Sequence, residues 1–214
     1  MLNKSGLWAK ARSKKTKIKM TRNKQTFSFL MTLLMTAVFG ILQAQEGYQL
    51  NSQQHFKVAG TSTLHDWDME SQDARGQATI LIEDQQIKEI SSLKVLLPVR
   101  SLESGNNRMD RTAYDAIDAD DHEYVEFKLS GVRNISPDRV TATGQLTIAG
   151  EIREVTLRAN YSVNGNSVQF EGEHQIKFSQ FDVRPPRAML GTIRTGDELD
   201  IYFKANFVPS GRAN

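Results

Sequence analysis

Apolar residues recur at every second position along most of the chain beyond residue 47. The clearest run alternates apolar and polar side chains from Val155 to Tyr161. Two longer runs place one apolar set on a single face each: Val168, Phe170, Gly172, His174, Ile176 and Phe178, and then Leu199, Ile201, Phe203, Ala205 and Phe207. Successive side chains of a strand point to opposite faces, so such runs are typical of antiparallel strands with one apolar and one wet face. The sequence therefore predicts an all-β fold.

Turn signals separate the alternating runs. They are Glu83-Asp84, Ser136-Pro137-Asp138, Ala149-Gly150 and Asn164-Gly165, and the last is the strongest hairpin signal in the chain. The runs make about eight or nine strands without helical crossovers, so their edges need protection by closure into a barrel or by sandwich packing. Because several runs are long, we expect an eight-stranded antiparallel barrel, which has room for packed side chains or one small ligand.

Two segments break the alternation. In residues 104–121, Met109, Ala113, Tyr114 and Ile117 have the spacing of a helical stripe, which predicts a short helix between two strands. The stretch from Val183 to Asp197 contains two prolines and several turn formers, and we expect it to be a long loop. Loops of that length in compact domains often act as lids or ligand rims.

The first 44 residues differ from the rest in charge. They contain seven Lys, two Arg and no acidic residue, so they carry +9, and because the whole chain carries +2 the remaining residues carry −7. An acidic body repels phosphates, which argues against nucleic acid as a partner.

The same segment has the parts of a secretory signal peptide. A basic stretch at 21–26 precedes an apolar run from Phe27 to Leu42, and a small residue, Ala44, stands before a polar continuation. We predict a leader over 1–44 with cleavage after Ala44, and translation from Met20 would give it an ordinary length. An uncleaved anchor is the alternative, although a run of 16 residues is short for a bilayer span. The body, residues 45–214, is then periplasmic or secreted.

Candidates for chemistry are few. The chain has no cysteine, which excludes disulfides, a Cys-ligated zinc site and a thiol nucleophile. None of the four histidines has the spacing of a metal-binding pair, and we expect neither a metal nor a catalytic residue. The densest polar cluster is His65-Asp66-Trp67-Asp68, which fits a cation-binding site, a proton relay or a strand with Trp67 pointing inward.

Several segments together resemble the YceI-like family of secreted, lipocalin-like, polyisoprenoid-binding proteins. They are Phe56–Trp67, Leu97–Gly105 with Asn107–Arg111, Tyr124–Phe127, and Val140–Gly150 followed by Arg153–Leu157. The pattern Gly-x-Leu-Thr-Ile-x-Gly followed by a Val-Thr-Leu strand is the most telling. The segments span nearly all of residues 48–208, and their order and spacing carry the resemblance.

The resemblance implies a barrel with a helical insertion, whose lumen holds an isoprenoid quinone, a polyprenyl lipid or a similar amphiphile. No other cofactor is expected, and the membrane would be contacted only transiently, for ligand exchange; a homodimer is compatible with the sequence. From the apolar faces we expect the lumen to be lined by Val95, Leu97, Met109, Tyr114, Ile117, Phe127, Leu129, Ile148, Phe178, Phe181, Met189 and Phe203. A polar rim for the headgroup is predicted at Asn107, Arg108 and Arg111.

Three functions of different classes follow from these observations. The first is non-catalytic binding, transport or storage of a lipid-like ligand, which needs only a dry apolar channel because each buried methylene contributes about 0.8 kcal/mol. The second is a barrel module without ligand, which predicts a fully packed interior. The third is a small hydrolase using His65 with Asp66 or Asp68, which requires the imidazole and a carboxylate to converge in a pocket.

Overall fold

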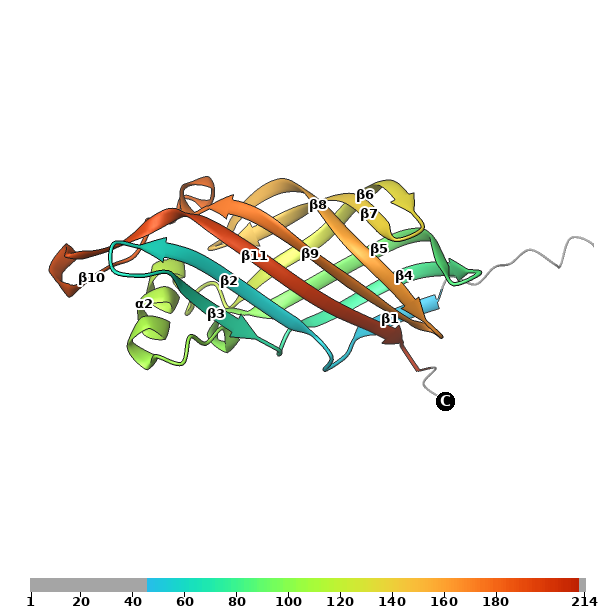
Figure 1. The fold of residues 1–214 in the computed structure, drawn as a ribbon, viewed down its shortest axis with the longest axis horizontal. Coiled ribbons are helices and arrows are strands. Elements are labelled where there is room, and N and C mark those ends of the chain that lie inside the picture. The colour runs from blue at the N-terminus through green and yellow to red at the C-terminus, as the bar shows by residue number, and fades with distance from the viewer. Residues whose placement is uncertain (1–45, 212–214) are drawn as a thin grey trace, which may run out of the picture. The chain divides into compact units, whose positions relative to one another are not determined.

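The computed structural model describes residues 46–211, whose path Figure 1 shows. The strands are β1 (Glu46–Leu50), β2 (His55–Ser62), β3 (Trp67–Ser71), β4 (Arg75–Glu83), β5 (Gln86–Pro98), β6 (Tyr124–Ser136), β7 (Arg139–Ile148), β8 (Glu151–Asn164), β9 (Ser167–Lys177), β10 (Arg187–Ala188) and β11 (Ile193–Pro209). The helical elements are α2 (Asn107–Ile117) and the 3₁₀ turns η1 (Val99–Ser101), η2 (Phe178–Phe181) and η3 (Met189–Gly191). The predicted leader, its cleavage site after Ala44 and the start at Met20 lie outside the described residues.

Eight of these strands form a closed antiparallel ring. The order is β1-β4-β5-β6-β7-β8-β9-β11, and pairing of β1 with β11 closes it. The predicted eight-stranded barrel is therefore confirmed. Closure removes the free strand edges that would otherwise invite pairing with other chains. All of these pairings lie within the compact unit Ala44–Asn214, so this unit contains a complete fold.

One edge of β11 is shared by β1 and β2, because β9 occupies the other edge. The chain leaves the ring between these two strands at residues 51–54, where the buried Gln54 side chain donates to the Ala74 carbonyl at 2.8 Å. β2 and β3 then form a hairpin that widens the sheet beside β11. An isolated bridge between Glu70 and Glu103 ties the outer edge of this hairpin to the segment before α2.

The tight turns follow from their residues. At Ala149 and Gly150 both φ angles are positive, at 49° and 78°, as a two-residue hairpin turn with the right twist requires. Gly165 has a φ of 61° in the turn that joins β8 to β9. The predicted hairpin at Asn164-Gly165 is confirmed.

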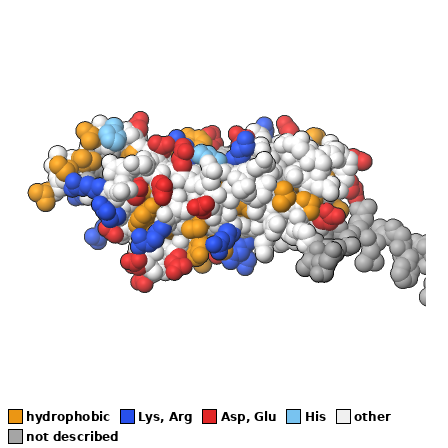
Figure 2. Space-filling model, turned by 90° about the horizontal axis from the view of Figure 1, so that it is seen from below, with side chains coloured by type: hydrophobic (Ala, Val, Ile, Leu, Met, Phe, Trp, Pro, Cys, Tyr) orange, Lys and Arg blue, Asp and Glu red, His pale blue; other side chains and the backbone are white. Residues whose placement is uncertain are grey.

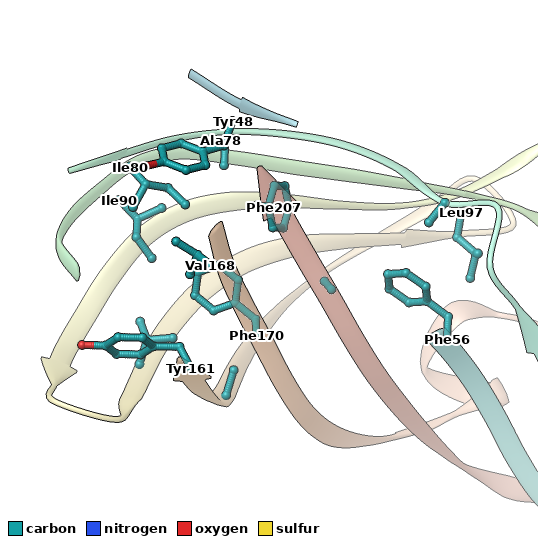
Figure 3. Close-up of a cluster of buried hydrophobic side chains, with 14 of the residues drawn as sticks. Tyr48, Phe56, Ala78, Ile80, Ile90, Leu97, Tyr161, Val168, Phe170 and Phe207 are labelled. Atoms are coloured by element: carbon teal, nitrogen blue, oxygen red, sulfur yellow. The ribbon is translucent and has the colours of Figure 1, made fainter. Parts of the chain in front are cut away.

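One end of the barrel, the closed end, is filled by side chains. Tyr48, Ile80, Val168 and Phe207 from four different strands are at most 3% exposed. Phe170 meets Phe207 edge-on, with ring centroids 6.0 Å apart. Figure 3 shows these side chains converging between the strands, whereas Leu97 and Phe56 lie farther along the barrel. Their packing gives the inward faces of the strands a dry core.

The predicted helix is present and its first turn is held by two polar side chains. The Asn106 side chain accepts hydrogen bonds from the backbone amides of Arg108 and Met109 at 3.0 and 3.3 Å, as an N-cap does. The buried Asp110 carboxylate accepts from the amide and the hydroxyl of Ser104. These bonds fasten the preceding loop to the helix. No helix within residues 46–211 is long and apolar enough to cross a bilayer.

The prediction of one long loop from Val183 to Asp197 is wrong in part. β11 already begins at Ile193, and Arg187–Ala188 pairs with it as a short hairpin. The start of β11 was not recognised in the sequence because the turn formers Gly196 and Asp197 fall inside the strand. The structure places a register shift there, between Thr195 and Leu199, and a bulge of this kind interrupts the alternation without ending the strand.

Candidate ligand-binding lumen

The barrel encloses a cavity of about 490 Å³ beyond the closed end. Its walls are the inward faces of six ring strands, β5 to β9 and β11, and of β2 and β3, together with one face of α2. At the other end of the barrel the cavity reaches the surface, since Leu64 and Met189 line it and are nevertheless 65% and 56% exposed. We call this end, bounded by α2, the β2–β3 turn and residues 183–193, the mouth.

Most of the predicted lining residues come together at the cavity. The following eleven line it: Val95, Leu97, Met109, Ile117, Phe127, Leu129, Ile148, Phe178, Phe181, Met189 and Phe203. They come from β5, α2, β6, β7, η2, η3 and β11, elements that are far apart in the sequence. Which of them touch a ligand remains a prediction.

Tyr114 does not line the cavity, which corrects the prediction for this residue. Its hydroxyl donates to the Leu102 carbonyl at 2.6 Å, and the Arg100 guanidinium lies 5.4 Å from its ring centroid. Burial raises the pKa of this phenol. The helical stripe that faces the lumen passes through Met109, Ala113 and Ile117 instead, so Tyr114 ties the helix to the segment after η1.

The predicted rim is present only in part. Arg108 lines the cavity, but Asn107 and Arg111 are exposed and do not. A 3.6-residue repeat turns these two positions away from the face that carries Met109. The neighbouring Asn106, which caps the helix, lines the cavity in their place.

Glycines on neighbouring strands make room for three large aromatic side chains of the lining. A Cβ atom at Gly60 would lie 2.5 Å from the Trp67 ring, and one at Gly172 would lie 2.8 Å from the Phe203 ring. At Gly144 an added Cβ would collide with the Phe127 ring. The bare backbone at these positions leaves each ring room to pack against the neighbouring strand.

Other lining residues were not among those predicted. They include Leu64, Trp67, Val155, Leu157, Leu199 and Ile201. Val155, Leu157, Leu199 and Ile201 belong to the inward faces that the alternation had already identified, so the sequence did contain their signal. The expected inward position of Trp67 is also found, and its indole donates to the Thr61 carbonyl at 3.1 Å.

Polar groups of the lining are few. His174 faces the cavity from β9, and burial lowers the pKa of its imidazole, which favours the neutral form. The others lie toward the mouth: Ser62, His65, Asn106, Arg108, Thr112, Lys177, Arg187 and Thr195. An apolar channel with such groups at its opening matches a ligand with a chain and a polar head.

The geometry at His65 does not assemble the catalytic pair that a hydrolase would need. The Nδ1 atom of this exposed imidazole lies 2.7 Å from the backbone carbonyl of Asp66. The Asp68 carboxylate instead pairs with the Lys57 ammonium at 2.5 Å. Over residues 46–211, no three acidic or histidine side chains gather in a way that could hold a metal ion.

The sequence pattern of the YceI-like domain matches residues 48–207, nearly the whole described part of the chain. The chain belongs to the YceI-like family. The matched residues therefore include the ring, the β2–β3 hairpin, α2 and the mouth in one domain. The resemblance inferred from the motifs is confirmed.

Solved structures show the same fold. Burkholderia cenocepacia BcnA is 21% identical, with a TM-score of 0.61 over 72% of this chain and 96% of its own. A polyisoprenoid binding domain from Saccharophagus degradans, implicated in plant cell wall breakdown, is 10% identical, with a TM-score of 0.60 over 76% and 98%. A Campylobacter jejuni YceI protein is 19% identical, with a TM-score of 0.50 over 61% and 79%. No curated protein matches the chain.

Proposed function

We propose that this YceI-like chain is a non-catalytic carrier or store for one isoprenoid or similarly lipid-like amphiphile, bound in the barrel lumen. The apolar chain lies along the inward faces of the strands, and the polar head lies at the mouth. The leader over residues 1–44 supports export, so the barrel works in the periplasm or outside the cell.

The cavity is the observation that carries this proposal. Its 490 Å³ lies within the 300–1,000 Å³ common for small-molecule sites. Each methylene moved from water into it contributes about 0.8 kcal/mol, so a long chain binds well without any directed contact. A packed module without ligand would lack such a cavity, and the exposed His65 argues against the hydrolase.

The choice of an isoprenoid rests on the family. One solved relative is described as a polyisoprenoid binding domain. The polar groups near the mouth include the cations Arg108, Lys177 and Arg187, so a phosphate or a quinone head is compatible with them.

Two measurements test the proposal on residues 45–214. Native mass spectrometry followed by organic extraction is expected to show a bound species of several hundred daltons with polyprenyl fragments. Trp67 is the only tryptophan in residues 45–214 and lines the lumen, so added quinone is expected to quench its fluorescence with saturation. A mass without ligand, unchanged by quinones and polyprenyl phosphates, contradicts the proposal.

Variants that fill the lumen separate cavity binding from adhesion to the outside. Met109→Trp and Phe127→Trp place a larger side chain in the lumen and are expected to lose the bound species. Lys128→Trp is the matched control, because this exposed neighbour of Phe127 puts the same indole on the outer face. Retention of the ligand in both lumen variants would contradict the binding site.

A further inference from the structure

Three exposed apolar side chains gather at the mouth. Leu190 is fully exposed, Leu64 is 65% exposed and Met189 is 56% exposed, and these are three of the six large apolar side chains exposed within residues 46–211. Leu64 lies on the β2–β3 turn, which is joined to the other segment by the Thr63 amide donating to the Arg194 carbonyl at 3.0 Å. Single exposed apolar residues are ordinary, but a group of them marks an interaction surface.

The second segment, residues 187–194, makes a projecting tip. Figure 1 shows β10 and the turn after it extending past α2 and the β2–β3 turn. Met189, Leu190 and Gly191 have φ angles of 53°, 57° and 89° in succession. Non-glycine residues rarely adopt this conformation, and it costs free energy that the surroundings must offset. Leu190 gains no burial in return within the described chain.

Cations surround this tip. Arg184, Arg187 and Arg194 are exposed, no acidic residue lies between 183 and 196, and none of the three forms an ion pair within the described part of the chain. Figure 2 shows blue and orange side chains close together at this end. The chain beyond residue 44 carries −7, so the tip is a positive region on an acidic body.

We propose that the tip, together with Leu64 and Arg184, docks on the surface of an anionic lipid bilayer. Leu64, Met189 and Leu190 enter the level of the headgroups, and the three arginines pair with lipid phosphates. The charge distribution selects this occupant, because an anionic surface attracts the tip and repels the acidic barrel wall. An acidic protein partner would satisfy the arginines but not an apolar tip that projects beyond the other elements.

Docking in this way places the lumen against the lipid. Met189 is exposed at the tip and also lines the cavity, as Leu64 does, so the docking surface and the mouth are continuous. An amphiphile could then pass from the bilayer into the barrel without crossing water. This use of the surface rests on the proposed carrier function, whereas the docking itself does not.

The test is sedimentation of residues 45–214, freed of ligand, with vesicles of phosphatidylcholine and phosphatidylglycerol at 7:3, and with phosphatidylcholine alone. We expect binding to the anionic vesicles that falls at 0.5 M salt and is at least tenfold weaker on the neutral ones. Replacing Arg184, Arg187 and Arg194 by Gln should weaken it ~100-fold, since each cation near such a surface contributes about fivefold. Leu190→Asp should weaken it roughly tenfold.

Three other arginines give a control of equal charge. Arg133, Arg139 and Arg158 are exposed on the barrel wall toward the closed end, and their replacement by Gln should change binding less than twofold. The docking proposal would be overturned by an equal loss of vesicle binding in this control, by equal binding to neutral vesicles, or by no binding at all.

The failure of docking and the failure of the carrier function can be told apart. Quinone added from solution reports on the lumen through Trp67, whether or not vesicles bind. Leu190→Asp is expected to keep this quenching. If the protein binds vesicles but takes up no amphiphile, the carrier function is contradicted and the docking proposal is still supported.

Discussion

The closed end and the mouth are built on the same kind of alternating strand, but their apolar side chains are buried at the first and exposed at the second. At the closed end Ile80, Val168 and Phe207 are at most 1% exposed. At the mouth, Leu64, Met189 and Leu190 are more than half exposed, and the cavity reaches the surface. Alternation therefore selects the side of a strand that faces inward, whereas the opposing elements decide whether that side meets protein or open space.

The difference arises from what covers each end. At the closed end β1 pairs with both β4 and β11 and brings Tyr48 onto the inner faces. At the mouth α2 and a strained turn surround the opening, and farther along the barrel the large rings of Phe127 and Phe203 pack over glycines. The closed end should thus carry the stability of the fold and the mouth its function.

Among the variants that test this division between the two ends, Ile80→Ala should have the largest effect on stability. Ile80 is 1% exposed and does not line the cavity, so the substitution leaves a void in a packed region. We expect the free energy of unfolding, measured in urea, to fall by about 2–5 kcal/mol. Leu190→Ala at the mouth should change it by less than about 0.5 kcal/mol. Comparable losses for the two variants would contradict the comparison.

Sequence reasoning predicted the strands, the helix and most inward residues, because all three depend on local periodicity. The closed ring followed from the need to protect the edges of so many strands. It misplaced Tyr114, since a stripe in the sequence does not say which helical side chains bond to a neighbouring segment. It also missed the start of β11, because the bulge beside Gly196 looks like a turn in the sequence. The cavity itself depends on how elements distant in the sequence fit together, and no local pattern reports that.

Asp110→Ala tests the mouth alone. The buried carboxylate of Asp110 accepts two hydrogen bonds from Ser104, and hydrogen bonds to charged groups contribute about 1.5–3 kcal/mol. We expect faster amide hydrogen exchange in α2 and weaker quinone quenching of Trp67, with the closed end still protected. Asp115→Ala, an exposed acid on the same helix, is the control. Equal loss of protection at both ends would show that they do not open separately.

The smallest expected effect concerns pH. Burial lowers the pKa of His174, so the unfolded chain, with an imidazole pKa near 6.5, binds a proton more readily than the folded one. The folded state therefore loses stability as the pH falls below about 6.5, and the loss stops growing below the folded pKa. His174→Asn should flatten the part of the pH dependence that this residue causes, as measured by urea unfolding between pH 7.5 and 5. An unchanged slope would place the imidazole in water, outside the dry lumen that the carrier function requires.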